Sequence, residues 1–165
     1  MADVFICHVE EDEAVAVALA GGLEAAGVTT WYYERDTDPG PSYLVQTGDA
    51  IDSCTAMILL ISSVAISNPK QMRSEIFHGY ERDKGLVPIL VDVTLTEFQQ
   101  GQPEWHRMAG PAAAVRVPES GISAIMDRLI RGLRSLGISV TAVATPPTPE
   151  RGAAEQGGPR SGRRR

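Results

Sequence analysis

Short runs of apolar residues alternate along the chain with segments whose apolar positions recur at helical spacing. The runs are continuously apolar rather than alternating, which is typical of strands that helices cover on both faces. They predict five strands, and the third has the strongest pattern. The predicted strands cover residues 4–7, 29–33, 56–61, 86–91 and 113–117.

Helical patterns separate these runs. Residues 12–26 place their apolar side chains on one stripe, and Gly27 is positioned to end that helix. A shorter helix is predicted over residues 43–53, and the last helix runs from about residue 120 to 136. The segment 94–110 has no clear period, so we expect it to be mostly loop.

A further helix is predicted after the third strand, where the sequence reads Asn68-Pro69. Asn68 is suited to cap this helix, because its side chain can accept a hydrogen bond from the first turn. Pro69 suits the first turn, and Gln71 occupies the third position of a capping box.

Alternation of strands and helices predicts a three-layer α/β domain, because right-handed crossovers place helices on both faces of a parallel sheet. We expect a flavodoxin-like, five-stranded parallel sheet with the strand order 2-1-3-4-5. Pro88 falls inside the fourth strand, where it removes a backbone donor. We therefore expect an irregularity or a sheet edge beside it.

Composition divides the chain into a domain over residues 1–138 and a tail over residues 139–165. The tail is rich in Pro, Gly and Arg and has almost no large apolar side chain, which predicts disorder or a linker. Residues 141–165 hold five Arg and two Glu, so the total charge of −6 leaves −9 for residues 1–140. Such an acidic domain repels nucleic acid, and we expect no nucleic-acid partner.

Other features of the sequence bear on membrane contact, on the state of the thiols and on metal binding. No apolar run approaches the length that spans a bilayer, and we expect no membrane contact. Cys7 and Cys54 are far apart in apolar surroundings, which fits buried thiols in a cytoplasmic protein. None of the three histidines has ligand spacing to a Cys or another His, so no metal site is predicted.

The loops after the strands exclude two kinds of functional site that are common in this fold class. Residues 8–12 are acidic and lack Gly, which excludes a phosphate-binding loop after the first strand. A phosphate-accepting receiver domain needs an Asp after the third strand. This chain has Ser62-Ser63 there.

Several segments together resemble the TIR domain family, in its bacterial form. Residues 3–8, Asp-Val-Phe-Ile-Cys-His, resemble its first-strand motif, and residues 28–40 resemble its second strand and the long loop that follows. Leu59-Leu60-Ile61-Ser62, followed by Glu75, resembles the third strand and the helix that carries the catalytic glutamate of the family. The resemblance extends from residue 3 to about 137, and Pro88 matches a Pro that is usual in the fourth strand.

The resemblance implies an NAD+ glycohydrolase that breaks the nicotinamide–ribose bond, with or without cyclisation, and that self-association activates. It implies a role in bacterial defence or signalling. NAD+ is then a substrate, and no cofactor is expected. Glu75 is implied as the catalytic residue. Four residues are expected to line the substrate site: His8, Val9, Glu10 and Arg35.

The same family contains modules that only assemble with further TIR domains, and this alternative stays open. Gln71 stands where enzymes of the family commonly have Trp, and Thr37 stands where Leu is usual. In either case the loop of Asp38, Pro39, Gly40 and Pro41 is expected to pack against a neighbouring TIR domain.

The predicted position of Glu75 is compatible with cleavage of the nicotinamide–ribose bond. At 100° per residue it lies at the margin of the stripe formed by Met72, Ile76 and Tyr80, beside Gly79, which is expected to leave room for a ligand. Nicotinamide leaves NAD+ as a neutral molecule and needs no general acid. One carboxylate that stabilises the cationic ribose can therefore suffice.

Overall fold

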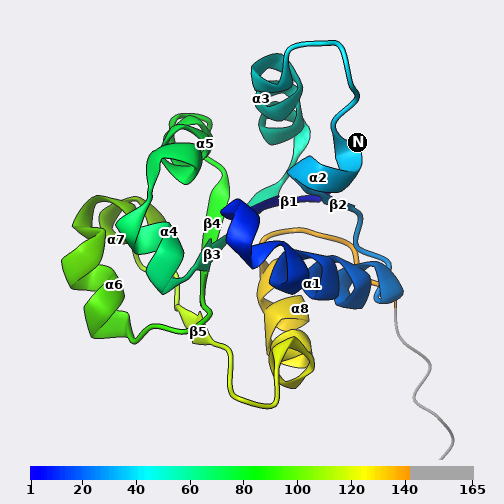
Figure 1. The fold of residues 1–165 in the computed structure, drawn as a ribbon. Helices are drawn as coiled ribbons and strands as arrows, with labels where there is room; N and C mark the ends of the chain where they lie inside the picture. The colour runs from blue at the N-terminus through cyan, green and yellow to red at the C-terminus, as the bar shows by residue number, and fades with distance from the viewer. Residues whose placement is uncertain (142–165) are drawn as a thin grey trace, which may run out of the picture.

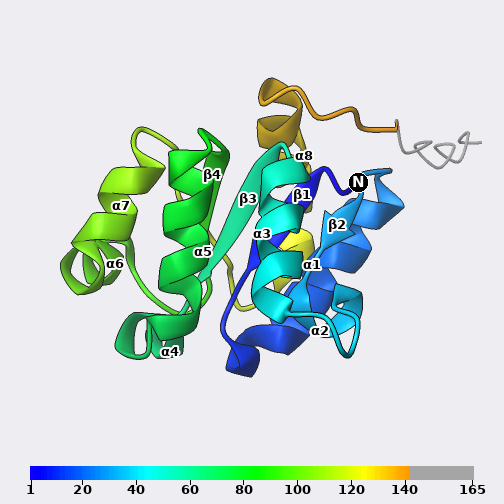
Figure 2. The same cartoon turned by 90° about the horizontal axis from the view of Figure 1, so that it is seen from above.

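A computed structural model describes residues 1–141 of the chain. Five parallel strands form one sheet in the order β2-β1-β3-β4-β5, which confirms the predicted fold class (Figures 1 and 2). The expectation of a disordered tail lies almost wholly outside the described residues. The chain remains packed past the predicted boundary, because Thr141 N donates to Ala26 O at 2.9 Å.

The strands alternate their side chains between two apolar cores, one on each face of the sheet. One core packs against α1 and α8, and the other packs against α3, α5, α6 and α7 (Figure 2). The strands are β1 (Val4–Cys7), β2 (Thr30–Trp31), β3 (Ala56–Ile61), β4 (Gly85–Leu90) and β5 (Val115–Arg116).

Most of the helices lie where the apolar spacing predicts them. The last one begins with a 3-10 turn, η2, before it becomes α8. The helical elements discussed below have these bounds: η1 (Glu10–Asp12), α1 (Glu13–Ala25), α2 (Tyr33–Asp36), α3 (Tyr43–Ser53), α4 (Ser63–Ser67), α5 (Lys70–Glu81), η2 (Ile122–Ile125) and α8 (Met126–Ser135).

Two local predictions are wrong. The segment 94–110 contains α6 (Leu95–Gly101) and α7 (Pro103–Ala109), which bury Phe98 and Trp105. Each of these helices has seven residues, too few for a helical period to show in the sequence. The expected cap at Asn68 is also absent, because α5 begins at Lys70 without a side-chain cap bond.

Pro88 lies in regular strand, and the sheet register explains why it is tolerated. Val91 N donates to Ile61 O of β3, so the backbone of Pro88, an odd number of residues away, faces β5 instead. Pairing of β4 with β5 begins only at Ile89. The missing N–H of Pro88 therefore faces the side on which no ladder bond is formed.

Candidate active site

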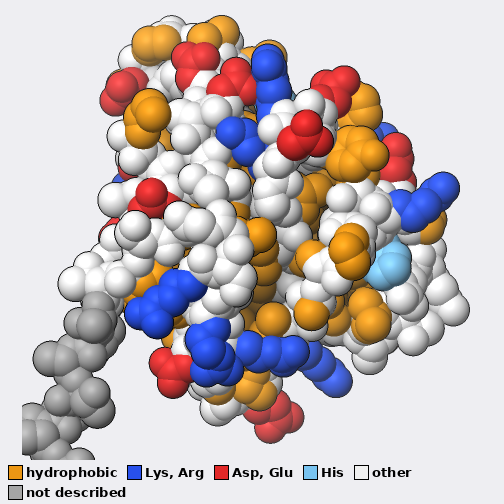
Figure 3. Space-filling view, turned by 180° about the vertical axis from the view of Figure 1, so that it is seen from behind, with side chains coloured by type: hydrophobic (Ala, Val, Ile, Leu, Met, Phe, Trp, Pro, Cys, Tyr) orange, Lys and Arg blue, Asp and Glu red, His pale blue; other side chains and the backbone are white. Residues whose placement is uncertain are grey.

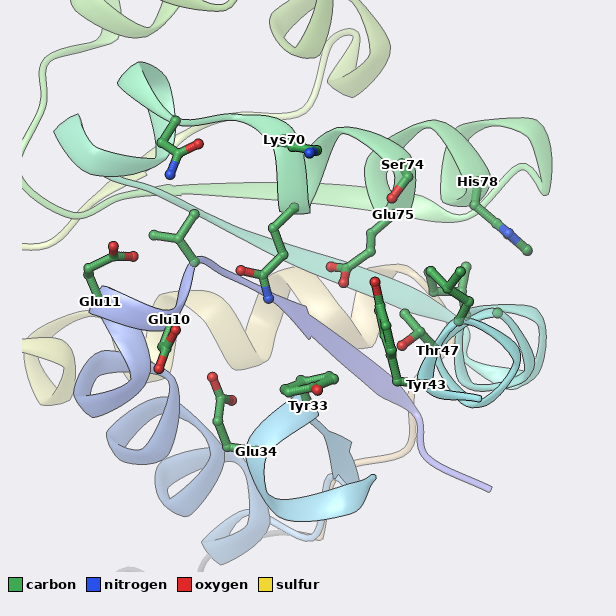
Figure 4. A pocket seen from close by; sticks show the side chains of 16 residues that line it. Glu10, Glu11, Tyr33, Glu34, Tyr43, Thr47, Lys70, Ser74, Glu75 and His78 are labelled. Carbon is green, nitrogen blue, oxygen red and sulfur yellow. The ribbon is translucent and has the colours of Figure 1, made fainter. Parts of the chain in front are cut away.

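A cleft of about 950 Å³ opens at the carboxyl ends of β1 and β2, between α3 and α5 (Figure 4). Ligands of doubly wound α/β folds bind at this edge of the sheet. Its walls come from η1, α2, α3 and α5. The volume is at the upper end of the range for small-molecule sites, so the cleft has room for an elongated ligand.

Glu75 projects from α5 into this cleft (Figure 4). From the adjacent strand β1, Cys7 Sγ donates a hydrogen bond to Glu75 Oε2 at 3.0 Å. Burial, with the neighbouring charge of Glu75, raises the pKa of the Cys7 thiol well above its ordinary value. The thiol therefore keeps its proton and holds one carboxylate oxygen in place.

The surroundings of Glu75 favour its protonated form more than water does. Burial raises its pKa to about 7, the Cys7 bond opposes this rise, and the charge of Glu34 adds to it. The side chain keeps some exposure at the cleft, yet protein surrounds the rest of it and removes much of its hydration. Both charge states of Glu75 are therefore populated near neutral pH.

Two details of the expected α5 stripe are wrong. Tyr80, expected in the core, is 51% exposed, and Gly79 is buried in its place. A Cβ at Gly79 would overlap Met57 Sδ, so this glycine permits close packing of α5 on β3. The space beside Glu75 comes from the separation of α5 and α3, and Gly79 does not provide it.

His8 is almost fully buried and lies behind the cleft rather than in its lining. Its Nε2 lies 2.9 Å from Glu34 Oε2, and its Nδ1 lies 3.2 Å from Ile6 O. A carbonyl oxygen only accepts hydrogen bonds, so Nδ1 donates to Ile6 O while Nε2 contacts the carboxylate of Glu34. His8 therefore orients Glu34, which does line the cleft.

Val9 and Glu10, two of the residues expected at a substrate site, line the cleft. Val9 is buried and Glu10 is exposed. Glu10, Glu11 and Glu34 place their carboxylates along the side opposite α5 (Figure 4). Lys70, in the first turn of α5, supplies positive charge at the other side.

Arg35 is expected in the cleft but is not among the residues that line it. Its guanidinium donates hydrogen bonds to Glu24, to Asp36 and to the backbone oxygen of Thr30. It also lies over the ring of Tyr32, 4.6 Å from the centroid. These contacts fix the short helix α2 against β2 and leave the guanidinium directed away from the cleft.

The predicted assembly loop, residues 38–41, is exposed and lines a smaller pocket of about 400 Å³. Gln46 of α3 holds it, because Asp38 N donates to Gln46 Oε1 at 2.7 Å and Gln46 Nε2 donates to Pro41 O at 3.2 Å. Gly40 adopts a φ of +105°, which favours glycine.

Sequence reasoning missed most of the residues that line the cleft. Tyr33 and Tyr43 line both the cleft and the loop pocket, and their rings meet edge to face at 5.9 Å. Glu34 and Thr47 also line the cleft. For Tyr33 and Glu34, the segment Tyr32-Tyr33-Glu34 directly after β2 was the available signal, since loops at this edge carry ligand contacts.

Comparison with known proteins agrees with this architecture. The family model described as "TIR domain" matches residues 4–115. The chain belongs to the TIR domain family. No curated protein sequence matches it.

Solved structures show the same TIR fold at low sequence identity. A TIR domain of the Toll-related receptor TRR-2 from Hydra magnipapillata has a TM-score of 0.61 and 22% identity, covering 81% of this chain and 99% of its own. A metazoan TIR-STING receptor from C. gigas, in complex with 2',3'-cGAMP, has a TM-score of 0.66 and 22% identity, covering 81% of this chain and 39% of its own.

A third similar structure comes from the TIR domains of the activated Roq1 resistosome, which directly recognises the pathogen effector XopQ. Its TM-score is 0.54 at 19% identity, with 84% of this chain and 86% of that chain covered.

Two further observations concern residues 1–141. Every helix described there is too short or too polar to span a bilayer. His, Cys, Asp and Glu side chains in this part of the chain form no group of three or more that could hold a metal ion.

Proposed function

We propose that this TIR domain cleaves the nicotinamide–ribose bond of NAD+, with Glu75 as the catalytic carboxylate. The observation that carries the proposal is the Glu75 carboxylate, which projects into a cleft large enough for a dinucleotide and is fixed by Cys7. Membership of a family that contains NAD-cleaving enzymes supports it.

The proposed reaction requires few catalytic groups from the protein. The bond between ribose C1′ and the nicotinamide nitrogen breaks, and its electron pair leaves with neutral nicotinamide. Ionised Glu75 stabilises the positive charge that develops on the ribose. Water then adds to C1′ and loses a proton to the solvent, which completes the hydrolysis. The aromatic rings of Tyr33 and Tyr43 offer surfaces to the planar base, and Lys70 at the start of α5 suits the pyrophosphate.

We further propose that self-association activates the enzyme. Tyr43, Leu44 and Val45 follow the loop of residues 38–41, and their side chains are 55%, 63% and 60% exposed. Contiguous exposed apolar side chains are typical of protein contact surfaces. A second TIR domain that covers this surface would order Tyr43 and Leu44, both of which also line the cleft.

Within this proposal the protein is a cytoplasmic TIR enzyme of the bacterial type, with a role in antiviral defence or signalling. The alternative is a TIR module without enzymatic activity. Gln71 favours that alternative, because it is an exposed polar side chain in the cleft lining where enzymes of the family commonly have Trp.

Nicotinamide release at increasing protein concentration tests the proposal. We expect wild type to release nicotinamide from NAD+ more than proportionally as its concentration rises, and Glu75→Ala to release none. Glu81→Ala is the matched control, because Glu81 is an exposed carboxylate on the same helix outside the cleft. Activity that persists in Glu75→Ala would refute the assignment. No activity of wild type at any concentration would favour the interaction module.

A further inference from the structure

Thr47 carries a buried hydroxyl that has no partner. The residue lies inside α3, lines the cleft together with Glu75, and is 7% exposed (Figure 4). Its Oγ1 makes no hydrogen bond with any group in residues 1–141. Within that part of the chain it is the one buried side-chain polar atom of this kind.

Several other hydroxyls within residues 1–141 are paired. Thr37 Oγ1 donates to Tyr33 O at 2.7 Å, and Ser53 Oγ, on the same helix as Thr47, donates to Ala50 O at 3.1 Å. Thr30, equally buried, donates to Glu24 Oε1 at 2.7 Å. A threonine in a helix ordinarily bonds to the carbonyl one turn earlier. Thr47 does not, so its hydroxyl, which is buried at the wall of the cleft, stays without a partner.

A buried hydroxyl without a partner destabilises a folded protein, and native structures contain few of them. When such a group lines a cleft, a ligand can supply the missing hydrogen bond. The ligand group must then be polar and must reach the wall formed by α3, which faces Glu75 on α5 (Figure 4).

We propose that Thr47 is a substrate-binding residue that hydrogen-bonds a hydroxyl of the nicotinamide-side ribose. The inference rests on the proposed function, because that reaction places the reacting ribose carbon beside Glu75. The ribose hydroxyls are one and two carbons from the reacting atom, so they lie within reach of the wall opposite Glu75. A hydroxyl both donates and accepts, which suits the hydroxyl of Thr47.

Binding of a carbocyclic NAD+ analogue, which the enzyme cannot cleave, tests this contact apart from catalysis. We expect Thr47→Val to bind the analogue about tenfold more weakly than wild type by calorimetry, because one ligand hydrogen bond is lost. Thr47→Ser keeps the hydroxyl and should bind within about threefold of wild type. For the same analogue without its nicotinamide-side ring hydroxyls, Thr47→Val and wild type should bind equally.

Thermal unfolding of the ligand-free variants gives a second readout that separates binding from structure. Thr47→Val should melt at the temperature of wild type or above it, because the substitution removes a buried polar atom that has no partner. Thr30→Val is the matched control. It should lose stability, because it breaks the bond to Glu24, and should bind the analogue as wild type does.

The outcomes distinguish the inference from the proposed function. Unchanged binding by Thr47→Val, or a loss of stability as large as that of Thr30→Val, would overturn the role of Thr47. If binding of the analogue depends on Thr47 but the protein releases no nicotinamide, the proposed reaction is refuted and the proposed contact of Thr47 is supported. A wild type that does not bind the analogue would refute both.

Discussion

Glu75 is held between two neighbours that act on it in opposite directions. The Cys7 thiol donates a hydrogen bond to the carboxylate and lowers its pKa, whereas the charge of Glu34 raises it. Desolvation outweighs both and brings the pKa of Glu75 to about 7. The population of the ionised form, which the proposed reaction requires, is therefore sensitive to small changes around it.

Substitution of the two neighbours should move the pH dependence of nicotinamide release in opposite directions. Cys7→Ala removes a donor to the carboxylate, so the pH of half-maximal rate should rise above that of wild type. Glu34→Gln removes a negative charge, so the half-maximal pH should fall. Cys7→Ser keeps a donor, and Cys54→Ala changes a buried thiol that bonds Ile51 O instead. Both should resemble wild type, and parallel shifts of Cys7→Ala and Glu34→Gln would contradict the account.

The raised pKa of Glu75 also makes a prediction about stability. Its pKa rises from an ordinary 4.5 to about 7 on folding, so wild type loses stability as the pH rises through that window. Glu75→Gln cannot ionise and should be more stable than wild type by about 1–3 kcal/mol at pH 8. The difference should shrink towards zero by pH 5. Urea unfolding at both pH values checks this, and an equal difference at both would count against it.

At the scale of elements, the strand and helix patterns predicted the sheet because alternating apolar runs and helical stripes leave only a small set of packing solutions. The pattern failed for α6 and α7, which bury little more than one large aromatic side chain each. It also failed for α2, a four-residue helix inside a polar run that reads as loop.

The candidate site was only partly predictable for a related reason. Glu75 follows a motif, but Glu34 reaches the cleft only because α2 turns it inward and His8, from the end of β1, holds it there. That pairing joins two residues 26 positions apart in the sequence, and no local pattern encodes it. Arg35, the residue after Glu34, points away from the cleft because its guanidinium binds Glu24, Asp36 and the backbone oxygen of Thr30 instead.

The loop of residues 38–41 is tied to α3 through one side chain, which gives a prediction at this scale. Gln46→Ala should expose the Asp38 amide, because Gln46 Oε1 is its acceptor. We expect amide hydrogen exchange at Asp38 to accelerate at least about tenfold, as for local opening of a surface loop. Gln100→Ala, an exposed glutamine of α6, is the control. Unchanged exchange at Asp38 would show that other contacts hold the loop.

Charge is unevenly distributed over the whole molecule. Carboxylates line one side of the cleft, whereas α8 carries exposed Arg128, Arg131 and Arg134. Figure 3 shows basic side chains gathered in the lower part of the face it draws, at the level of α8 in Figure 1. In the proposed reaction, the carboxylates of the cleft would attract the cationic nicotinamide ring, and that attraction would end when the ring leaves as a neutral molecule.

The most direct measurement is the rate of nicotinamide release from NAD+ by concentrated wild type and by Glu75→Gln, from pH 5.5 to 8.5. Gln keeps the shape of Glu75 and removes its charge. We predict that the wild-type rate rises with pH, with a midpoint near the pKa of about 7, and that Glu75→Gln is slower by at least about a hundredfold at pH 8. A Glu75→Gln variant that releases nicotinamide at the wild-type rate would contradict the account.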